Sequence, residues 1–356
     1  MAVRWRQRRI SVVDRTSQME LLVSYYLGYL ATHLIRLGVD SGLFAALAAH
    51  TEGTTADELG HEMRFNTRYV EHFLRGGYAL QLLDYDPAAG RYRLAAHMGV
   101  LLAEPENFRY VGNLAHLYIL AGRDFSLMPG FLKTGATYPF EEHDEDLIEA
   151  AANATNGLAT FVAKALVRRL PGLKGRDDVA ALDIGCGAGG MIVALARAFP
   201  RGRVVGIDIE PRSVEMASAR IRATGLEGRA EARLAAAEDL DESSAYDLVT
   251  MMQVLHETRQ EVRDTILERA HGALRPGGVL LIIDEPYPHD KSSLPKAPAA
   301  ALTQFVEIFM GNVLLSPESQ KQLVEDWLPG AIADDTSPRP HLHHHCPASS
   351  MMLACP

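Results

Sequence analysis

The segment AALDIGCGAGG, residues 180–190, constrains the fold of this chain more than any other part of the sequence. An apolar run ends in a cluster of glycines, and the helix-forming run MIVALARAF follows at once. This order is typical of a strand, a tight loop and a helix whose N-terminus binds a cofactor. Gly185, Gly187 and Gly190 fit the G-x-G-x-x-G spacing of dinucleotide-binding loops, and Gly189 completes a G-x-G-x-G pattern as well. The spacing alone leaves the cofactor undecided.

From residue 179 onward, short apolar runs alternate with helical segments. The strand candidates are VAALDI, RVVGIDI, YDLVTMMQVL, VLLIIDEP and SSMMLAC. This alternation predicts an α/β domain with a doubly wound, Rossmann-like parallel sheet at residues 172–356. Ligands of such sheets bind beyond the carboxyl ends of the strands, and the glycine loop lies at one of those ends.

The N-terminal third has a different pattern. Apolar residues recur at helical spacing through residues 20–49, and Thr55, followed by a glutamate three residues later, is typical of a helix start. A second start signal, Asn66 or Thr67, precedes another helical run, and DYDPAAGRYRL predicts two strands joined by a turn. Helix, helix and hairpin in this order predict a mostly helical winged-helix domain at residues 16–104.

Composition limits the classes of partner. The net charge of −10 repels a polyanion, and the second helix of the winged-helix domain sets Arg68 and Arg75 against Glu71, so we expect dimerisation rather than nucleic-acid binding. No run approaches the roughly 20 apolar residues of a membrane helix. Three cysteines make no disulfide framework, so we expect a cytoplasmic protein without a membrane partner. Residues 1–15 carry five arginines, which predicts a disordered basic tail, an untranslated segment or a phosphate-binding arm.

Two carboxylates favour one cofactor class. Asp183 lies two residues before Gly185, where it would repel a pyrophosphate but suit the cationic amino and sulfonium groups of S-adenosylmethionine. Asp208 ends the next strand, 21 residues after Gly187, where a carboxylate accepts ribose hydroxyls in either class of cofactor.

Four ordered motifs, LDIGCGAGG, GIDIE, YDLVTMMQVLHE and LRPGG, resemble those of the class I S-adenosylmethionine-dependent methyltransferases. The segment VLHE is similar to the V-L-H-D segment of O-methyltransferases that carry an N-terminal winged-helix dimerisation domain. The resemblance implies a homodimer, a small-molecule acceptor with a hydroxyl oxygen, and a helical connector at residues 105–171 that caps the acceptor pocket. The cofactor-binding residues that we expect are Asp183, Gly185, Gly187, Gly189, Asp208, Ile209 and Gln253.

The adenine-binding acid of this family is poorly matched. The stretch LAAAEDL has Ala235 and Ala236 where the family has a carboxylate. Either Glu238 or Asp239 then contacts the adenine, or both lie in a solvated turn.

The resemblance assigns His256 as the base that deprotonates the acceptor hydroxyl, and the ordinary pKa of histidine suits that task. Asp284 matches the acid that orients the base, and the adjacent Glu285 is the alternative. A further orienting acid has no clear match in MGNVLLSPES. We expect Glu257 only to favour a helix start. His256 could instead only shape the pocket, the acceptor atom could be nitrogen, sulfur or carbon, and the chain could be a cofactor-sensing regulator.

The segment HLHHHC places four histidines and a cysteine between the last two predicted strands. His341, His343 and His345 would share one strand face, and with Cys346 they offer zinc or copper ligands. The alternative, which we favour, is pocket lining without a metal.

Overall fold

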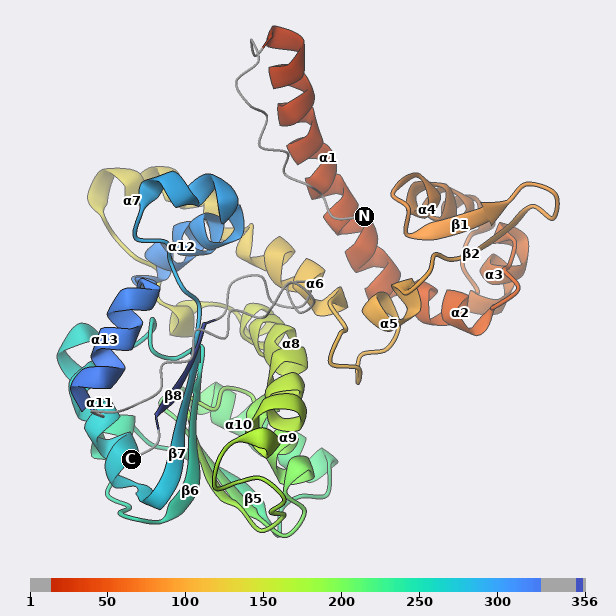
Figure 1. Cartoon of the computed structure of the whole chain (residues 1–356). Coiled ribbons are helices and arrows are strands. Elements are labelled where there is room, and N and C mark those ends of the chain that lie inside the picture. The colour runs from red at the N-terminus through yellow and green to blue at the C-terminus, as the bar shows by residue number, and fades with distance from the viewer. Residues whose placement is uncertain (1–13, 328–349, 355–356) are drawn as a thin grey trace. The chain divides into compact units, whose positions relative to one another are not determined.

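The computed structural model describes residues 14–327 and 350–354 and separates the chain into two compact units, Met1–Arg123 and Asp124–Pro356 (Figure 1). Each unit has its own hydrophobic core. The division lies inside residues 105–171, which we assigned to a helical connector. Part of that segment therefore belongs to the first unit and the rest to the second.

The first unit has the winged-helix order that the sequence predicts. Its described elements are α1 (Arg15–Asp40), α2 (Leu43–Ala49), α3 (Ala56–Met63), α4 (Thr67–Ala79), β1 (Leu83–Asp86), β2 (Arg91–Leu94), α5 (Met98–Leu102) and α6 (Gly112–Ala121). The strands β1 and β2 pair in antiparallel fashion, as the turn-centred stretch predicts.

Capping side chains determine where these helices begin. Asp14 caps α1, so this helix begins inside the segment that we assigned to the basic tail, which is a correction at its last two residues. Thr55 and Glu58 form the predicted capping box of α3. Asn66, rather than Thr67, caps α4.

The core of the first unit lies between α2, α3, α4 and the hairpin, with the rings of Phe44 and Phe73 5.6 Å apart. On α4, Arg75 donates to Glu71 at 2.5 Å, so one of the two arginines of this helix is paired with a carboxylate. Among the described helices, none alone is long and apolar enough to cross a membrane. Only α1 and α2 together reach that length and composition, as a pair bent by 66°.

The second unit is built on a six-stranded sheet in the order β5-β4-β3-β6-β7-β8. The strands are β3 (Ala180–Ile184), β4 (Arg203–Asp208), β5 (Ala230–Leu234), β6 (Tyr246–Met252), β7 (Leu274–Asp284) and β8 (Ser350–Ala354). All neighbours are parallel except β8, which pairs with β7 in antiparallel fashion. The predicted parallel sheet therefore has one antiparallel edge strand, because an apolar run predicts a strand but not its direction.

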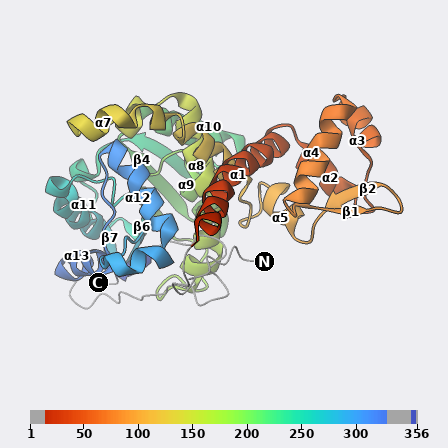
Figure 2. The same ribbon diagram turned by 90° about the horizontal axis from the view of Figure 1, so that it is seen from above.

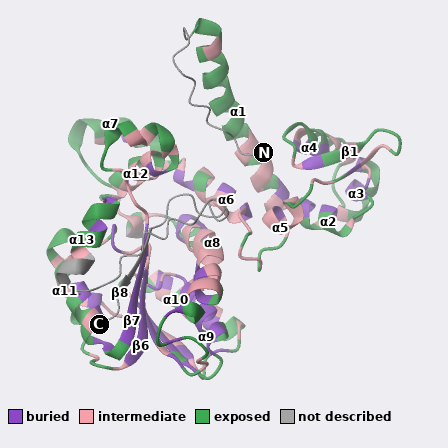
Figure 3. Cartoon of the chain, in the orientation of Figure 1, coloured by how far each residue is buried: buried purple, intermediate pink, exposed green. Residues whose placement is uncertain are grey.

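Helices cover both faces of the sheet, as Figures 1 and 2 show from two sides. One face carries α8 (Glu145–Phe161), α9 (Gly190–Ala198) and α10 (Pro211–Ala223); the other carries α11 (Gln260–Gly272) and α13 (Pro317–Trp327). Successive strand residues alternate between the two cores, as Ala181 and Leu182 illustrate. The central strands β3, β4 and β6, and β7 from Gly278 onward, are mostly buried (Figure 3). The Rossmann-like expectation is confirmed.

The remaining helical elements are short or lie outside these two layers. They are η1 (Asp124–Ser126), α7 (Met128–Thr134), η2 (Phe140–Glu142), η3 (Val162–Leu166), η4 (Val167–Arg169), η5 (Ala237–Asp239), η6 (Lys291–Lys296) and α12 (Pro298–Met310).

Candidate active site

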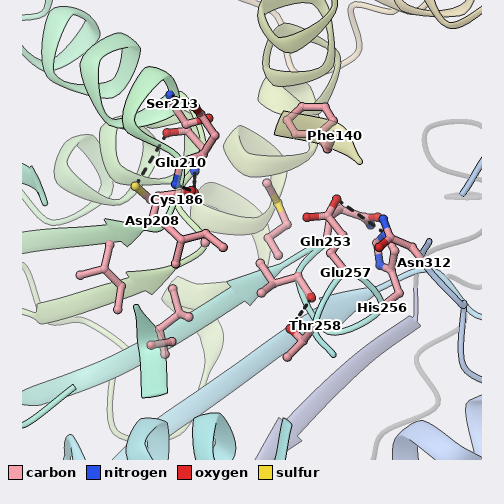
Figure 4. Close-up of a pocket in the computed structure, with 18 of the residues that line it drawn as sticks. Phe140, Cys186, Asp208, Glu210, Ser213, Gln253, His256, Glu257, Thr258 and Asn312 are labelled. Carbon is pink, nitrogen blue, oxygen red and sulfur yellow. Dashed lines mark hydrogen bonds and ion pairs between the residues drawn. The ribbon is translucent and has the colours of Figure 1, made fainter. Parts of the chain in front are cut away.

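A cavity of about 980 Å³ lies at the carboxyl ends of β3, β4 and β6. Its walls are the glycine loop, these strand ends, α8 and the turn that follows α12. The volume is near the upper end of the roughly 300–1,000 Å³ typical of ligand pockets, so a cofactor and an acceptor both fit. Figure 4 shows two groups of polar side chains at opposite ends: Asp208, Glu210 and Ser213, and Gln253, His256, Glu257 and Asn312.

Three glycines of the loop have left-handed backbone conformations. Gly185, Gly187 and Gly189 have φ values of 66°, 49° and 78°. A Cβ at Gly185 would lie 2.4 Å from a methyl carbon of Val254, whereas a Cβ at Gly187 would meet no atom within 4 Å. The G-x-G-x-G pattern is therefore the one that the backbone requires, and Gly187 leaves space on the cavity side.

Asp183 is buried beneath this loop. It is 2% exposed and accepts a hydrogen bond from the Thr250 hydroxyl at 2.6 Å. Burial raises the pKa of Asp183 to about 7, partly offset by that hydrogen bond, with a further rise from the charge of Asp208. Asp183 thus joins β3 to β6 in the cavity wall, where a nearby cationic group would stabilise its ionised form.

Asp208 lies at the end of β4 and holds the loop. Its carboxylate accepts from the Gly187 amide at 2.8 Å and from the Glu210 amide at 2.9 Å. Burial raises the pKa of Asp208, and these amide hydrogen bonds oppose the rise. The next residue, Ile209, is 72% exposed and lines the cavity.

Of the other residues predicted to bind the cofactor, two line the cavity and one does not. Gln253 lines the cavity with a left-handed φ of 62°, a conformation that costs energy for a residue with a side chain. Glu238 also lines the cavity, together with Ala235. Asp239 is exposed and is not part of the cavity wall, so of the two candidate acids only Glu238 is brought to the site.

His256 is buried at the other end of the cavity. Its Nδ1 is hydrogen-bonded to Asp284 Oδ1, and its backbone amide donates to Asp284 Oδ2 at 3.0 Å. Glu285 makes no contact of this kind: its amide donates to Asp284 at 2.8 Å, and its own Oε2 is buried without a hydrogen-bond partner in the described residues. Of the two candidate orienting acids, the structure places Asp284 beside the histidine.

Two further carboxylates approach His256 Nε2. Glu257 Oε1 lies 3.9 Å away and Glu307 Oε2 lies 4.0 Å away. Burial would lower the pKa of His256, but Asp284, Glu257 and Glu307 outweigh it and raise the pKa to about 9. The imidazole is therefore mostly protonated at neutral pH.

Sequence reasoning missed the approach of both glutamates to His256. Glu257 was expected only at a helix start, but α11 begins at Gln260 and the Glu257 side chain is 51% exposed within the cavity wall. Enclosure by that wall raises the pKa of Glu257. Glu307 lies three residues before MGNVLLSPES, the segment in which we looked for a further orienting acid. It is the one charged residue in the α12 sequence PAAALTQFVEIFM, and this isolation is the signal that could have identified it.

The histidine-rich segment with His341, His343, His345 and Cys346 lies outside the described residues. Within the part of the chain that the structure describes, no group of three or more histidine, cysteine or acidic side chains could hold a metal ion.

Comparisons with known proteins match both units. Residues 181–278 match the family described as "Methyltransferase domain", and residues 30–104 match the "Rv2258c-like winged HTH domain". The 3-hydroxy-5-methyl-1-naphthoate 3-O-methyltransferase of Streptomyces sahachiroi is 28% identical over 282 residues, which is 76% of this chain and 79% of that protein. The chain is an S-adenosylmethionine-dependent methyltransferase.

Other relatives of the methyltransferase agree with this assignment. The demethylspheroidene O-methyltransferase of Cereibacter sphaeroides is 28% identical over 224 residues, which is 60% of this chain and 57% of that protein. The fold matches human N-acetylserotonin methyltransferase in complex with S-adenosylmethionine, with a TM-score of 0.68, 17% identity and coverage of 97% and 99% of the two chains. Mitomycin 7-O-methyltransferase matches with a TM-score of 0.67, 18% identity and coverage of 96% and 99%.

The cavity of the methyltransferase fits its cofactor. S-adenosylmethionine carries cationic amino and sulfonium groups, and Asp183 and Asp208 place two carboxyl groups beside the glycine loop. Gly187 leaves open space where the methionine part must approach the backbone. The exposed Ile209 adds an apolar surface to the cavity wall, of the kind on which an aromatic ring packs.

Proposed function

We propose that this methyltransferase transfers the methyl group of S-adenosylmethionine to a hydroxyl oxygen of a small organic molecule. His256 acts as the general base. The observation that carries the proposal is the position of this histidine: it lines the cavity, and Asp284 holds its Nδ1. A base held in this way leaves Nε2 to accept a proton from an acceptor.

Methyl transfer is an in-line displacement, and the bound cofactor supplies a methyl group on a cationic sulfur. The protein must then align the acceptor oxygen and take its proton. His256 Nε2 receives this proton, while Asp284 fixes the tautomer and stabilises the imidazolium that forms. Glu257 and Glu307, within 4.0 Å of Nε2, add to that stabilisation.

The charges around His256 favour a hydroxyl over other acceptors. A carboxylate acceptor needs no base, and Glu257, Glu307 and Asp284 would repel it. A neutral amine also needs no base before it attacks the methyl group. The buried histidine and its carboxylate therefore support oxygen of a phenol or alcohol as the acceptor atom, rather than nitrogen.

For cofactor binding we propose that Asp183, Gly185, Gly187 and Gly189 surround the methionine part, and that Asp208 and Ile209 contact the ribose and adenine. Glu238 is the proposed adenine contact, because it lines the cavity while Asp239 does not. Gln253 completes the wall between the cofactor and His256.

We test the proposal by replacing His256 with Asn and measuring methyl transfer to a panel of phenols and alcohols. We expect kcat to fall by about 10²–10⁴, the usual contribution of a positioned base, with unchanged affinity for S-adenosylmethionine. The matched control is His143→Asn, because His143 is equally buried and also pairs with a carboxylate, Asp124, but does not line the cavity. Full activity of His256→Asn would refute the assignment of the base.

We also propose that the protein forms a homodimer through α1. Much of this helix is exposed in Figure 3, and its exposed residues include Tyr26 at 66%, Tyr29 at 62% and Leu30 at 62%. Together with Leu22 these side chains follow a spacing of four, three and one residues, which places them on one side of the helix. A continuous apolar face of this size is typical of a protein interface.

A further inference from the structure

One wall of the cavity comes from α8 rather than from the sheet. Four residues of the i, i+3, i+4 and i+7 pattern line it: Ile148, Ala151, Ala152 and Thr155. This spacing places them on one face of the helix. The position of α8 therefore sets the width of the cavity, so the contacts that hold α8 also affect ligand binding.

The helix α10 holds α8 at two places. Arg220 donates from Nη1 to Asn156 Oδ1 at 2.7 Å and from Nη2 to Asn153 Oδ1 at 2.8 Å. Nearer the N-terminus of α8, Arg212 donates to Glu145 at 2.7 Å. The second pair is much more exposed, with side-chain exposures of 42% and 72%, so it contributes little.

The Arg220 contacts also reach the glycine loop. A Cβ at Gly190 would lie 2.5 Å from Asn156 Oδ1 and 3.5 Å from Arg220 Nη1. Gly190, unlike the three glycines before it, has no left-handed φ. Its missing side chain therefore accommodates the amide of Asn156, and this close contact fixes the distance between α8 and the start of α9.

The same arginine is connected to the ribose end of the cavity. Arg220 lies on α10, which begins at Pro211, three residues after Asp208 at the end of β4. Glu210 caps this helix by accepting from the Ser213 amide. Asp208, Glu210 and Ser213 all line the cavity. Arg220 thus links the α8 wall, the start of α9 and the segment after β4.

We propose that Arg220 is a positioning residue for the cofactor. By holding Asn153 and Asn156 it keeps the α8 wall in place against the glycine loop, so that S-adenosylmethionine enters a cavity that is already formed. The inference rests on the cofactor assignment above. The proton-transfer residues His256 and Asp284 lie on other elements, so loss of Arg220 acts on cofactor affinity and leaves kcat at saturating cofactor largely unchanged.

The first experiment titrates S-adenosylmethionine calorimetrically into the full-length protein and its Arg220→Met, Arg220→Lys and Arg212→Met variants. We expect the Kd to rise about tenfold in Arg220→Met, because two hydrogen bonds are lost. Lysine can replace one of those bonds, so Arg220→Lys should give an intermediate Kd. The control Arg212→Met removes the exposed contact of the same pair of helices and should change the Kd less than about twofold.

A second experiment remains decisive if Arg220→Met does not fold. Gly190→Ala should weaken cofactor binding in the wild type, but have no effect in an Asn156→Ala background, because the new methyl group then meets no amide. Equal Kd values for wild type and Arg220→Met, or an equal effect of Gly190→Ala in both backgrounds, would overturn the proposal. Absence of binding to the wild type would instead contradict the cofactor assignment.

Discussion

At the scale of single residues, the site is organised around one imidazole among several carboxylates. Asp284 holds Nδ1 of His256, while Glu257 and Glu307 lie 3.9 Å and 4.0 Å from Nε2. These carboxylates stabilise the protonated imidazole, which is the form that the proposed proton transfer would produce, but they also favour that form before any reaction. The proposed reaction needs the neutral imidazole as base, so its rate should depend on pH.

The first prediction concerns this pH dependence. The pKa of His256 is raised to about 9, and only the neutral imidazole accepts a proton. We therefore expect kcat/KM to rise from pH 7 to about pH 9 and then level off. Glu307→Gln removes one charge that raises the pKa, so its profile should turn at lower pH. The exposed Glu268→Gln on α11 is the control, and a profile that is flat or falls from pH 7 to 9 would contradict the assignment.

At the scale of elements, the strand, loop and helix from β3 to α9 form one wall of the cavity in which we propose that the cofactor binds. The backbone of this loop needs glycines because it adopts positive φ, and because Gly185 lies so close to Val254 that a side chain at this position would clash. Two separate penalties therefore oppose a side chain at Gly185. One is the left-handed backbone, and the other is the steric contact.

The second prediction separates these penalties. Gly185→Ala should lower the free energy of unfolding by the strain of a left-handed alanine, roughly 1–2 kcal/mol, plus about 1–3 kcal/mol for overpacking against Val254. Gly175→Ala is the matched control, because Gly175 has a φ of 78° but open space around its Cβ position. Chemical denaturation of both variants measures the difference. Equal losses of stability would show that the contact with Val254 has no cost.

Most elements could be predicted from local signals, and the exceptions have physical causes. Caps such as Thr55 and Asn66 act within a few residues, so sequence alone locates those helix starts. The direction of β8 and the approach of Glu307 to His256 depend on long-range packing, which no local pattern encodes. The same holds for Arg220, whose partners are 64 and 67 residues away in the sequence.

At the scale of the whole molecule, the chain combines a catalytic unit with a winged-helix unit whose long first helix exposes an apolar face. Arg75 of the winged-helix unit is paired with Glu71, and the chain carries a net charge of −10. Both features fit association between proteins better than association with nucleic acid.

The third prediction concerns this association. Replacing Tyr26 and Leu30 with Glu puts two charges on the apolar face of α1, so we expect the dimer to dissociate. Sedimentation equilibrium of the wild type and the double variant measures the change in mass. Ser17→Glu together with Ser24→Glu adds the same side chains to the opposite side of α1, and serves as control. A monomeric wild type would contradict the proposed homodimer.

The most direct test of the central claim is the position of the transferred methyl group. S-adenosylmethionine labelled with ¹³C in its methyl group would be incubated with the wild type and a panel of hydroxylated aromatic acceptors that also carry amines. NMR of the product then identifies the methylated atom. Our account predicts a methoxy carbon, formed by the wild type and by His143→Asn but not by His256→Asn. A methyl group on nitrogen or carbon, or a methoxy product formed equally well by His256→Asn, would contradict it.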